Sequence, residues 1–148
     1  SGSILIDADG LWCLSQQDWQ VKEDQEWILT PHPGELSRLL DQEIDDDADR
    51  LVKVRRFSAE HNVTVLSKGY PVIVGTPGNK IFLTGYDTRV FARAGFGDVL
   101  SGKIGAFWTL TGQAEIACFH GLLNGKKKSD RLTGSADHSY MLEPLDLI

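Results

Sequence analysis

The sequence predicts an α/β layered domain. Strand-length apolar runs, segments of helical periodicity and one hairpin follow one another along the chain, without a repeat or an internal linker. Several of the apolar runs end in acidic or glycine residues, as buried parallel strands do where they face a site. The 148 residues leave room for one core, and 41% hydrophobic with 24% charged residues is typical of a globular chain.

The strands are predicted from short runs of apolar and β-branched residues. Residues 4–6 end in Asp7-Ala8-Asp9-Gly10, and residues 27–30 run into Pro31-His32-Pro33-Gly34. A third strand at residues 63–66 closes on Ser67-Lys68-Gly69. Residues 72–74 and 81–83 form a hairpin around a turn that contains Pro77-Gly78-Asn79.

Helical periodicity predicts four helices. One begins after Gly34, a second spans about residues 45–61, a third runs from the Gly97-Asp98 region to Gly112, and a fourth covers residues 113–124. The pattern weakens after Gly125. We therefore expect residues 4–125 to form the domain and residues 126–148 to be a loop and a C-terminal segment, with residues 126–139 lacking regular structure.

Composition excludes several classes of partner. A net charge of −6 argues against binding to nucleic acid, and no apolar run has the roughly 20 residues of a membrane-spanning helix. Cys13 and Cys118 are far apart, with neither a CxxC motif nor a cluster of histidines and cysteines. We therefore expect no metal-ligand set and reduced thiols in a cytoplasmic protein.

The strongest chemical signal is Gly95-Phe96-Gly97-Asp98 at the start of a predicted helix. Backbone N–H groups and the helix dipole favour an anion there, and glycines let phosphate oxygens approach closely. Asp98 has a simpler interpretation as a residue that matches the helix dipole. The two interpretations are equally supported by this segment alone.

Four motifs follow one another along the chain: Asp7-Ala8-Asp9-Gly10, Leu29-Thr30-Pro31-His32-Pro33-Gly34-Glu35, Leu66-Ser67-Lys68-Gly69 and Ala94-Gly95-Phe96-Gly97-Asp98-Val99-Leu100-Ser101-Gly102. In order and spacing, residues 4–125 resemble the ADP- or ATP-dependent NAD(P)H-hydrate dehydratases of the ribokinase-like superfamily. The Pro31 to Glu35 run is the most specific part, and His120-Gly121 matches a further pair of that family.

The resemblance implies repair of hydrated NADH or NADPH, in which a nucleotide phosphorylates the C6 hydroxyl and loss of phosphate restores the reduced ring. Asp98 would be the base that accepts the hydroxyl proton, and would also contact the hydrate. The backbone of Gly95, Phe96 and Gly97 would stabilise the transferring phosphoryl group.

The resemblance also assigns binding residues. Lys68-Gly69-Tyr70-Pro71-Val72 matches the adenine-nucleotide segment, with Lys68 as a point charge for the phosphates of ADP or ATP. His32 matches a residue that touches the hydrated cofactor, although a histidine between two prolines is also typical of a structural turn. Asp7 and Asp9 are candidates for holding Mg²⁺ through water, and equally for strand-end acids bonded to the backbone.

The chain also departs from the family pattern. Phe96 replaces a small hydroxyl residue, which removes a phosphate donor and is expected to place a ring in the anion loop. Val72 replaces a threonine, and Tyr86-Asp87 replaces an Asn-Pro pair. The family domain extends about as far again on the N-terminal side, so we expect a ribokinase-like layered α/β/α sheet that lacks its N-terminal half, with residues 1–3 as a cloning scar.

Two further hypotheses follow from these departures. One is a non-catalytic nucleotide-binding or assembly module derived from the enzyme. The other is a small-molecule kinase of the same superfamily, against which the Pro31 to Glu35 run argues. An unpaired sheet edge and an uncovered apolar face both promote association. We therefore expect a homo-oligomer, and specifically a homodimer with a shared sheet or exchanged elements.

Overall fold

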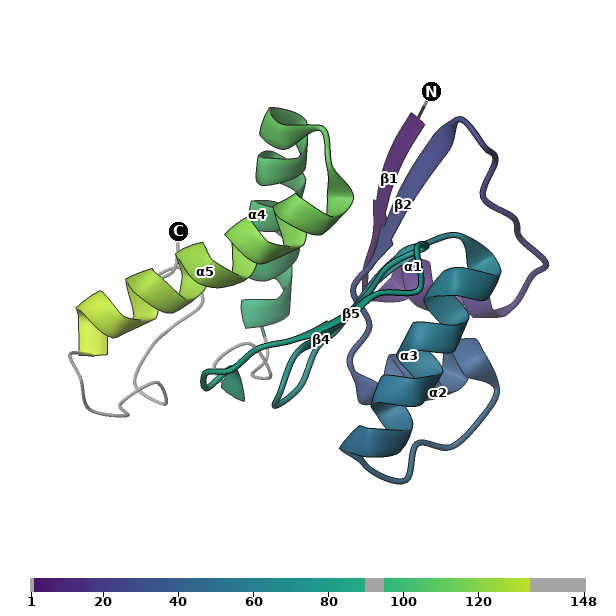
Figure 1. Cartoon of the computed structure of the whole chain (residues 1–148), viewed down its shortest axis with the longest axis horizontal. Helices are drawn as coiled ribbons and strands as arrows, with labels where there is room; N and C mark the ends of the chain where they lie inside the picture. The colour runs from purple at the N-terminus through teal and green to yellow at the C-terminus, as the bar shows by residue number, and fades with distance from the viewer. Residues whose placement is uncertain (1, 90–94, 134–148) are drawn as a thin grey trace.

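The computed structural model describes residues 2–89 and 95–133. Its centre is a mixed five-stranded sheet in the order β1-β2-β3-β4-β5 (Figure 1). The strands β1 (Gly2–Ile6), β2 (Gln25–Leu29) and β3 (Thr64–Ser67) are parallel. β4 (Ile73–Gly75) and β5 (Ile81–Leu83) are the predicted hairpin and run antiparallel.

Helices cover both faces of the sheet. α1 (Asp9–Ser15), α2 (Pro33–Leu40) and α3 (Asp47–His61) lie on one side, and α4 (Phe96–Thr111) and α5 (Ala114–Thr133) lie on the other (Figure 1). Within the described residues, no helix is both long and apolar enough to cross a membrane. The three-layer α/β/α arrangement predicted from the sequence is confirmed.

The two cores follow from the alternation of side chains along the strands. Ile28 and Leu66 point into the core beneath α4 and α5, where Leu100, Ile104 and Trp108 are also buried. Their neighbours Leu29 and Val65 point into the core beneath α1 to α3, with Leu36, Val54 and Phe57. These strands are apolar on both faces because each face is covered by helices.

Most helix boundaries have a local cause. His32 caps the amides of the first turn of α2, and the Asp46 carboxylate accepts from the Asp49 amide at 2.8 Å at the start of α3. Asn62 ends α3 in the left-handed conformation. α4 begins after Gly95 (φ 82°) and ends at Gly112 (φ 66°), as the glycine pattern predicts.

Two helices differ from what the sequence predicts. The short helix α1 was not predicted, because its seven residues contain too few turns to show periodicity. α5 continues past Gly125 to Thr133, so residues 126–133 are not a loop. An ion pair between Lys126 and Asp130, one helical turn apart, and the burial of Ser129 support this extension. Residues 134–148 lie outside the described residues.

β1 is the outermost strand on its side of the described sheet. It pairs with β2 in the register Gly2↔Gln25 to Ile6↔Leu29, and has no partner on its other side within residues 2–89 and 95–133. Ile4, in the middle of the strand, is 37% exposed although its run of residues is apolar. This geometry agrees with the expected unpaired edge.

Candidate functional site

The carboxyl ends of the three parallel strands meet at one edge of the sheet and carry polar residues. Asp7 follows β1, Thr30 follows β2, and Lys68 follows β3. Ser101, from the second turn of α4, reaches the same place: its Oγ donates to Asp7 Oδ2 at 2.5 Å and lies 3.3 Å from Thr30 Oγ1. The sheet edge and α4 together therefore form a polar site at the position where α/β folds bind ligands.

Lys68 is the central cation of this site. Only 8% of the residue is exposed, and its Nζ lies 2.8 Å from Asp7 Oδ1 and 3.9 Å from Glu35 Oε2. Burial raises the pKa of Asp7, but hydrogen bonds from Lys68 and Ser101 and the charge of Lys68 outweigh it, so this pKa lies below its usual value. Asp7 is therefore an anion that neutralises Lys68.

The tip of Lys68 rests against the first turn of α4. A Cβ atom placed on Gly97 would lie only 3.3 Å from Lys68 Nζ, so the missing side chain of Gly97 leaves the space that the ammonium occupies. Gly95 adopts φ 82° as the N-cap of α4 and has no side chain with which to cap the first-turn amides. The structure thus brings Lys68 and the Gly95 to Asp98 segment together, with Asp98 exposed in the first turn.

Phe96 does not place its ring in the anion loop, contrary to expectation. The residue is 1% exposed and packs in the core with Leu66, Leu100 and Ile104. Helix periodicity turns the first residue of α4 toward the sheet, and the ring follows. The substitution still lacks a hydroxyl, but its ring lies in the core and not at the first-turn amides.

His32 has a structural role that the sequence left open. Its Nδ1 accepts from the amides of Gly34 (3.0 Å) and Glu35 (3.3 Å), and the Glu35 carboxylate accepts from the His32 amide at 2.8 Å. This reciprocal pair is a capping box at the start of α2. The side chain remains 56% exposed, and its Nε2 lies 3.5 Å from Glu35 Oε1.

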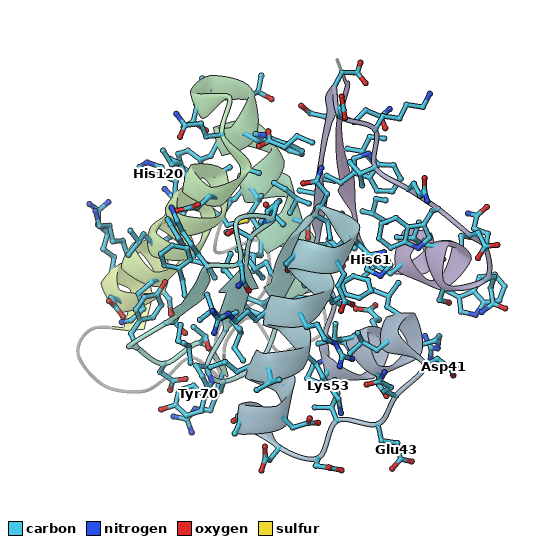
Figure 2. The ribbon with its side chains drawn as sticks, turned by 45° about the vertical axis from the view of Figure 1, so that its right-hand side comes forward. Asp41, Glu43, Lys53, His61, Tyr70 and His120 are labelled. Carbon is cyan, nitrogen blue, oxygen red and sulfur yellow. The ribbon has the colours of Figure 1, made fainter. Side chains whose placement is uncertain are left out.

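The segment from Lys68 to Val72 has an unusual backbone, and its side chains differ in exposure. Gly69 adopts φ 146°, and the peptide bond between Tyr70 and Pro71 is cis. Tyr70 is 56% exposed and points outward (Figure 2). Val72 is fully buried, so its side chain belongs to the core.

An apolar pocket of about 180 Å³ lies beside this segment, between the β4–β5 hairpin and α5. Val72, Phe82 and Leu122 are among its lining residues, together with Tyr86 and Leu123. Val72, the last residue of the Lys68 segment, is one of the residues that line the pocket. The segment therefore leads from Lys68 to the edge of the pocket.

The His120-Gly121 pair of the family pattern lies on α5. His120 lies on the exposed side of α5 and stacks on Phe107, with ring centroids 5.3 Å apart (Figure 2). A Cβ atom on Gly121 would lie 2.7 Å from the Ile104 side chain. Gly121 therefore permits the close packing of α5 on α4, and His120 lies on the exposed side of α5.

The described residues contain no group of three or more His, Cys, Asp or Glu side chains that could hold a metal ion. Asp9 is exposed in the first turn of α1, and Asp7 is engaged by Lys68 and Ser101. The two acids therefore do not form a preformed carboxylate pair for Mg²⁺.

Sequence reasoning missed Ser101, Glu35 and Arg50 as parts of the site. Ser101 and Glu35 lie within the quoted motifs, so their positions near the candidate residues Asp98 and His32 were a usable signal. Arg50 is in no motif, yet it is buried and binds the backbone on both sides of Gly69. Only the fold brings it to the site.

Comparison with known proteins agrees with this geometry. A model of the NAD(P)H-hydrate dehydratase family matches residues 1–146. The chain is 38% identical over 104 residues to a bifunctional NAD(P)H-hydrate repair enzyme of Mycobacterium leprae, covering 70% of this chain and 22% of that protein. It is 37% identical over 108 residues to an ADP-dependent (S)-NAD(P)H-hydrate dehydratase of Neisseria meningitidis, covering 70% and 36%.

Solved structures share the fold. An ADP/ATP-dependent NAD(P)H-hydrate dehydratase from Bacillus subtilis, co-crystallised with ATP and Mg²⁺, superposes with a TM-score of 0.84 at 20% identity, over 98% of this chain and 51% of that one. A ribokinase-like superfamily protein from Enterococcus faecalis gives 0.75 at 20% identity, over 97% and 48%. The chain thus spans about half of these structures and less of the curated relatives. The fold is ribokinase-like, and the chain belongs to the NAD(P)H-hydrate dehydratase family.

Proposed function

We propose that this chain provides the nucleotide-phosphate and catalytic-base part of an ADP- or ATP-dependent NAD(P)H-hydrate dehydratase. The observation that carries the proposal is the position of the Lys68 ammonium against Gly97, at a helix N-terminus whose first turn contains Asp98. A cation and a helix N-terminus that face the same space favour the phosphates of a nucleotide.

The nucleotide is bound in two parts under this proposal. The amides of Gly95, Phe96 and Gly97 and the Lys68 ammonium hold the phosphates. Gly69, Tyr70, Pro71 and Val72 lead to the apolar pocket beside the hairpin, which suits an adenine ring. Phosphate oxygens then replace Asp7 as the partner of Lys68, and the released Asp7 carboxylate is the group best placed to hold Mg²⁺ through water.

Asp98 is the base in the proposed reaction. It accepts the proton of the C6 hydroxyl while that oxygen forms a bond to the terminal phosphoryl group and the bond to the nucleotide breaks. The C6–O bond of the phosphorylated hydrate then breaks with loss of phosphate and a proton, which restores the double bond of NADH or NADPH. The exposure of Asp98 leaves its carboxylate accessible to such a substrate.

His32 contacts the hydrated cofactor through Nε2 in this arrangement. Its Nδ1 is occupied as the acceptor of the α2 cap, which makes Nε2–H the donor, and a ligand would have to compete with Glu35 Oε1 at 3.5 Å for it. Glu35 connects this histidine to the phosphate site, because its carboxylate accepts from the His32 amide and lies 3.9 Å from Lys68 Nζ.

A second candidate is a nucleotide-binding or assembly module without catalysis. Two observations favour it: Lys68 is neutralised by Asp7, and the β1 edge has no partner within the described strands. The same edge supports a homo-oligomer that joins copies along β1. We place the protein in the cytoplasm, in keeping with its two free cysteines.

Formation of NADH from NADH hydrate, with ADP or ATP, tests the catalytic proposal. Wild-type chain is compared with Asp98→Asn, and ADP binding by both is measured in parallel. We expect the variant to bind ADP but to lose turnover by on the order of 10² or more. ADP binding without wild-type turnover would support the module instead. Absence of both would contradict the dehydratase and the nucleotide-binding module, and would leave the assembly module to a measurement of the oligomeric state.

A further inference from the structure

Arg50 is a buried cation that lies behind the nucleotide segment. It belongs to α3 and is 2% exposed, although arginine is almost never fully buried without partners. Its Nε and Nη2 donate to Asp47 Oδ1 at 3.1 and 2.8 Å. Asp47 is 61% exposed, so the ion pair neutralises the guanidinium from the solvent side and leaves its inner edge for other acceptors.

The inner edge of Arg50 binds the backbone between Ser67 and Pro71. Nη1 donates to the Ser67 carbonyl (3.3 Å), the Ser67 Oγ (3.0 Å) and the Lys68 carbonyl (3.1 Å). Nη2 donates to the Pro71 carbonyl at 2.7 Å. One planar guanidinium therefore holds the segment on both sides of Gly69, a geometry that a lysine ammonium does not reproduce.

Two other bonds complete the support of this segment. Thr88 Oγ1 donates to the Gly69 carbonyl at 2.6 Å, and the Lys68 amide donates to the Pro31 carbonyl at 2.8 Å. Gly69 adopts φ 146°, and a Cβ atom there would lie 2.9 Å from Arg50 Nη1. The guanidinium thus fills the space that the glycine leaves empty, so the two residues constrain one another.

We propose that Arg50 is a positioning residue of the nucleotide site, which holds residues 67–71 in the conformation that directs Lys68 toward Gly97 and Asp7. This inference rests on the proposed nucleotide site. Arg50 acts through Lys68: it bonds to the Lys68 carbonyl, and the side chain of that residue carries the ammonium to the first turn of α4. Loss of the hydrogen bonds from the Arg50 guanidinium releases the backbone of residues 67–71. The position of Lys68 Nζ then becomes variable.

The test compares Arg50→Lys with Arg56→Lys in the full chain. Arg56 is on the same helix, but its side chain is 52% exposed and its nearest acid is Glu60 at 3.8 Å. Amide hydrogen exchange of residues 67–72 is measured without nucleotide, and the Kd for ADP is measured by calorimetry. We expect Arg50→Lys to accelerate exchange in this segment and to raise the Kd about tenfold, as loss of a charge-assisted hydrogen bond implies. Arg56→Lys should change neither.

A purely structural role gives a different result. It predicts faster exchange throughout the sheet and an unchanged Kd for ADP at temperatures where both proteins are folded. That outcome, or exchange and Kd equal to those of Arg56→Lys, overturns the inference. If Arg50→Lys does not fold, the test uses Ser67→Ala, which removes one acceptor of Arg50 Nη1. We expect this variant to accelerate exchange in residues 67–72 and to raise the Kd for ADP by less than Arg50→Lys would. Unchanged exchange and an unchanged Kd would contradict the inference.

Failure of the proposed function is distinguishable from failure of this inference. If the wild-type chain does not bind ADP, the nucleotide proposal fails, whereas the exchange measurement still decides whether Arg50 holds the segment. If the wild type binds ADP and turns over, Arg50→Lys should raise the KM for the nucleotide and leave the KM for NADH hydrate unchanged. Equal effects on both KM values contradict positioning through Lys68.

Discussion

Lys68 Nζ and Asp7 Oδ1 lie 2.8 Å apart, and their side chains are only 10% and 13% exposed. The pair joins the end of β3 to the end of β1, with Ser101 of α4 bonded to the other carboxylate oxygen. Asp7 thereby neutralises a cation, Lys68, that lies against the first turn of α4. Under the proposed function, the same carboxylate competes with the phosphates of the nucleotide.

Removal of this carboxylate should destabilise the chain. Asp7→Asn leaves Lys68 largely buried with Glu35 at 3.9 Å as its remaining acid, and loss of one partner of a buried pair costs about 3 kcal/mol. Urea unfolding at neutral pH measures the change. A loss below about 1 kcal/mol, the range of exposed ion pairs, would contradict the buried character of the interaction.

The same pair predicts an acid dependence of stability. The pKa of Asp7 is lowered below its ordinary 3.8, so around this pH the unfolded chain binds more protons than the folded chain. The contribution of Asp7 is therefore complete well above pH 3.8 and is lost as the pH falls through the lower folded value. Asp49 and Asp87 have lowered pKa values too, so the relevant quantity is the wild-type dependence minus that of Asp7→Asn. A zero difference would contradict the prediction.

A side chain at Gly97 should impair nucleotide binding without unfolding the chain. In Gly97→Ala the Cβ lies 3.3 Å from Lys68 Nζ, and Asp7 limits how far the ammonium can move. We expect the Kd for ADP, measured by calorimetry, to rise about tenfold.

The matched control is Gly102→Ala, on the same helix with open space at its Cβ position. It should leave the Kd unchanged and raise the free energy of unfolding by about 0.5–1 kcal/mol, the helix advantage of alanine over glycine. Equal ADP affinities for the two variants would show that the space beside Gly97 is not part of the nucleotide site.

The two cysteines should differ in reactivity. Cys118 is buried in the core beneath α5, and burial raises its pKa to about 12, whereas Cys13 is exposed on α1. Because the thiolate is the reactive form, a maleimide should label Cys13 rapidly and Cys118 only after unfolding. Mass spectrometry of native and urea-treated protein counts the labels. Rapid double labelling of the native chain would contradict the packing of α5.

The sequence predicted the parts of the fold whose causes are local. The parallel strands, the hairpin and the end of α4 at Gly112 follow from apolar runs and turn residues. The family resemblance assigned Lys68 and Gly97 to one nucleotide site, and the structure brings the two residues side by side. The parts that it did not predict depend on contacts between distant segments. Arg50 is linked to the site by bonds that cross 17 to 21 positions of the chain, and no local pattern indicates them.

The orientation of Phe96 depends on tertiary structure for the same reason. Its position in a glycine-rich segment predicted a ring in the anion loop, but the start of α4 turns that ring into the core between α4 and the sheet. α5 likewise continues beyond Gly125, where Ser129 is buried although residues 126–130 are almost all charged.

The most direct test of the phosphate site is titration calorimetry with ADP on the wild-type chain, Lys68→Met and Lys22→Met. Lys22 is exposed before β2 and serves as the charge-matched control. We predict that the wild type and Lys22→Met bind ADP equally and that Lys68→Met binds at least about tenfold more weakly, because a charge-assisted phosphate contact is lost. Absence of wild-type binding, or equal binding by Lys68→Met, would contradict the phosphate site described at the N-terminus of α4.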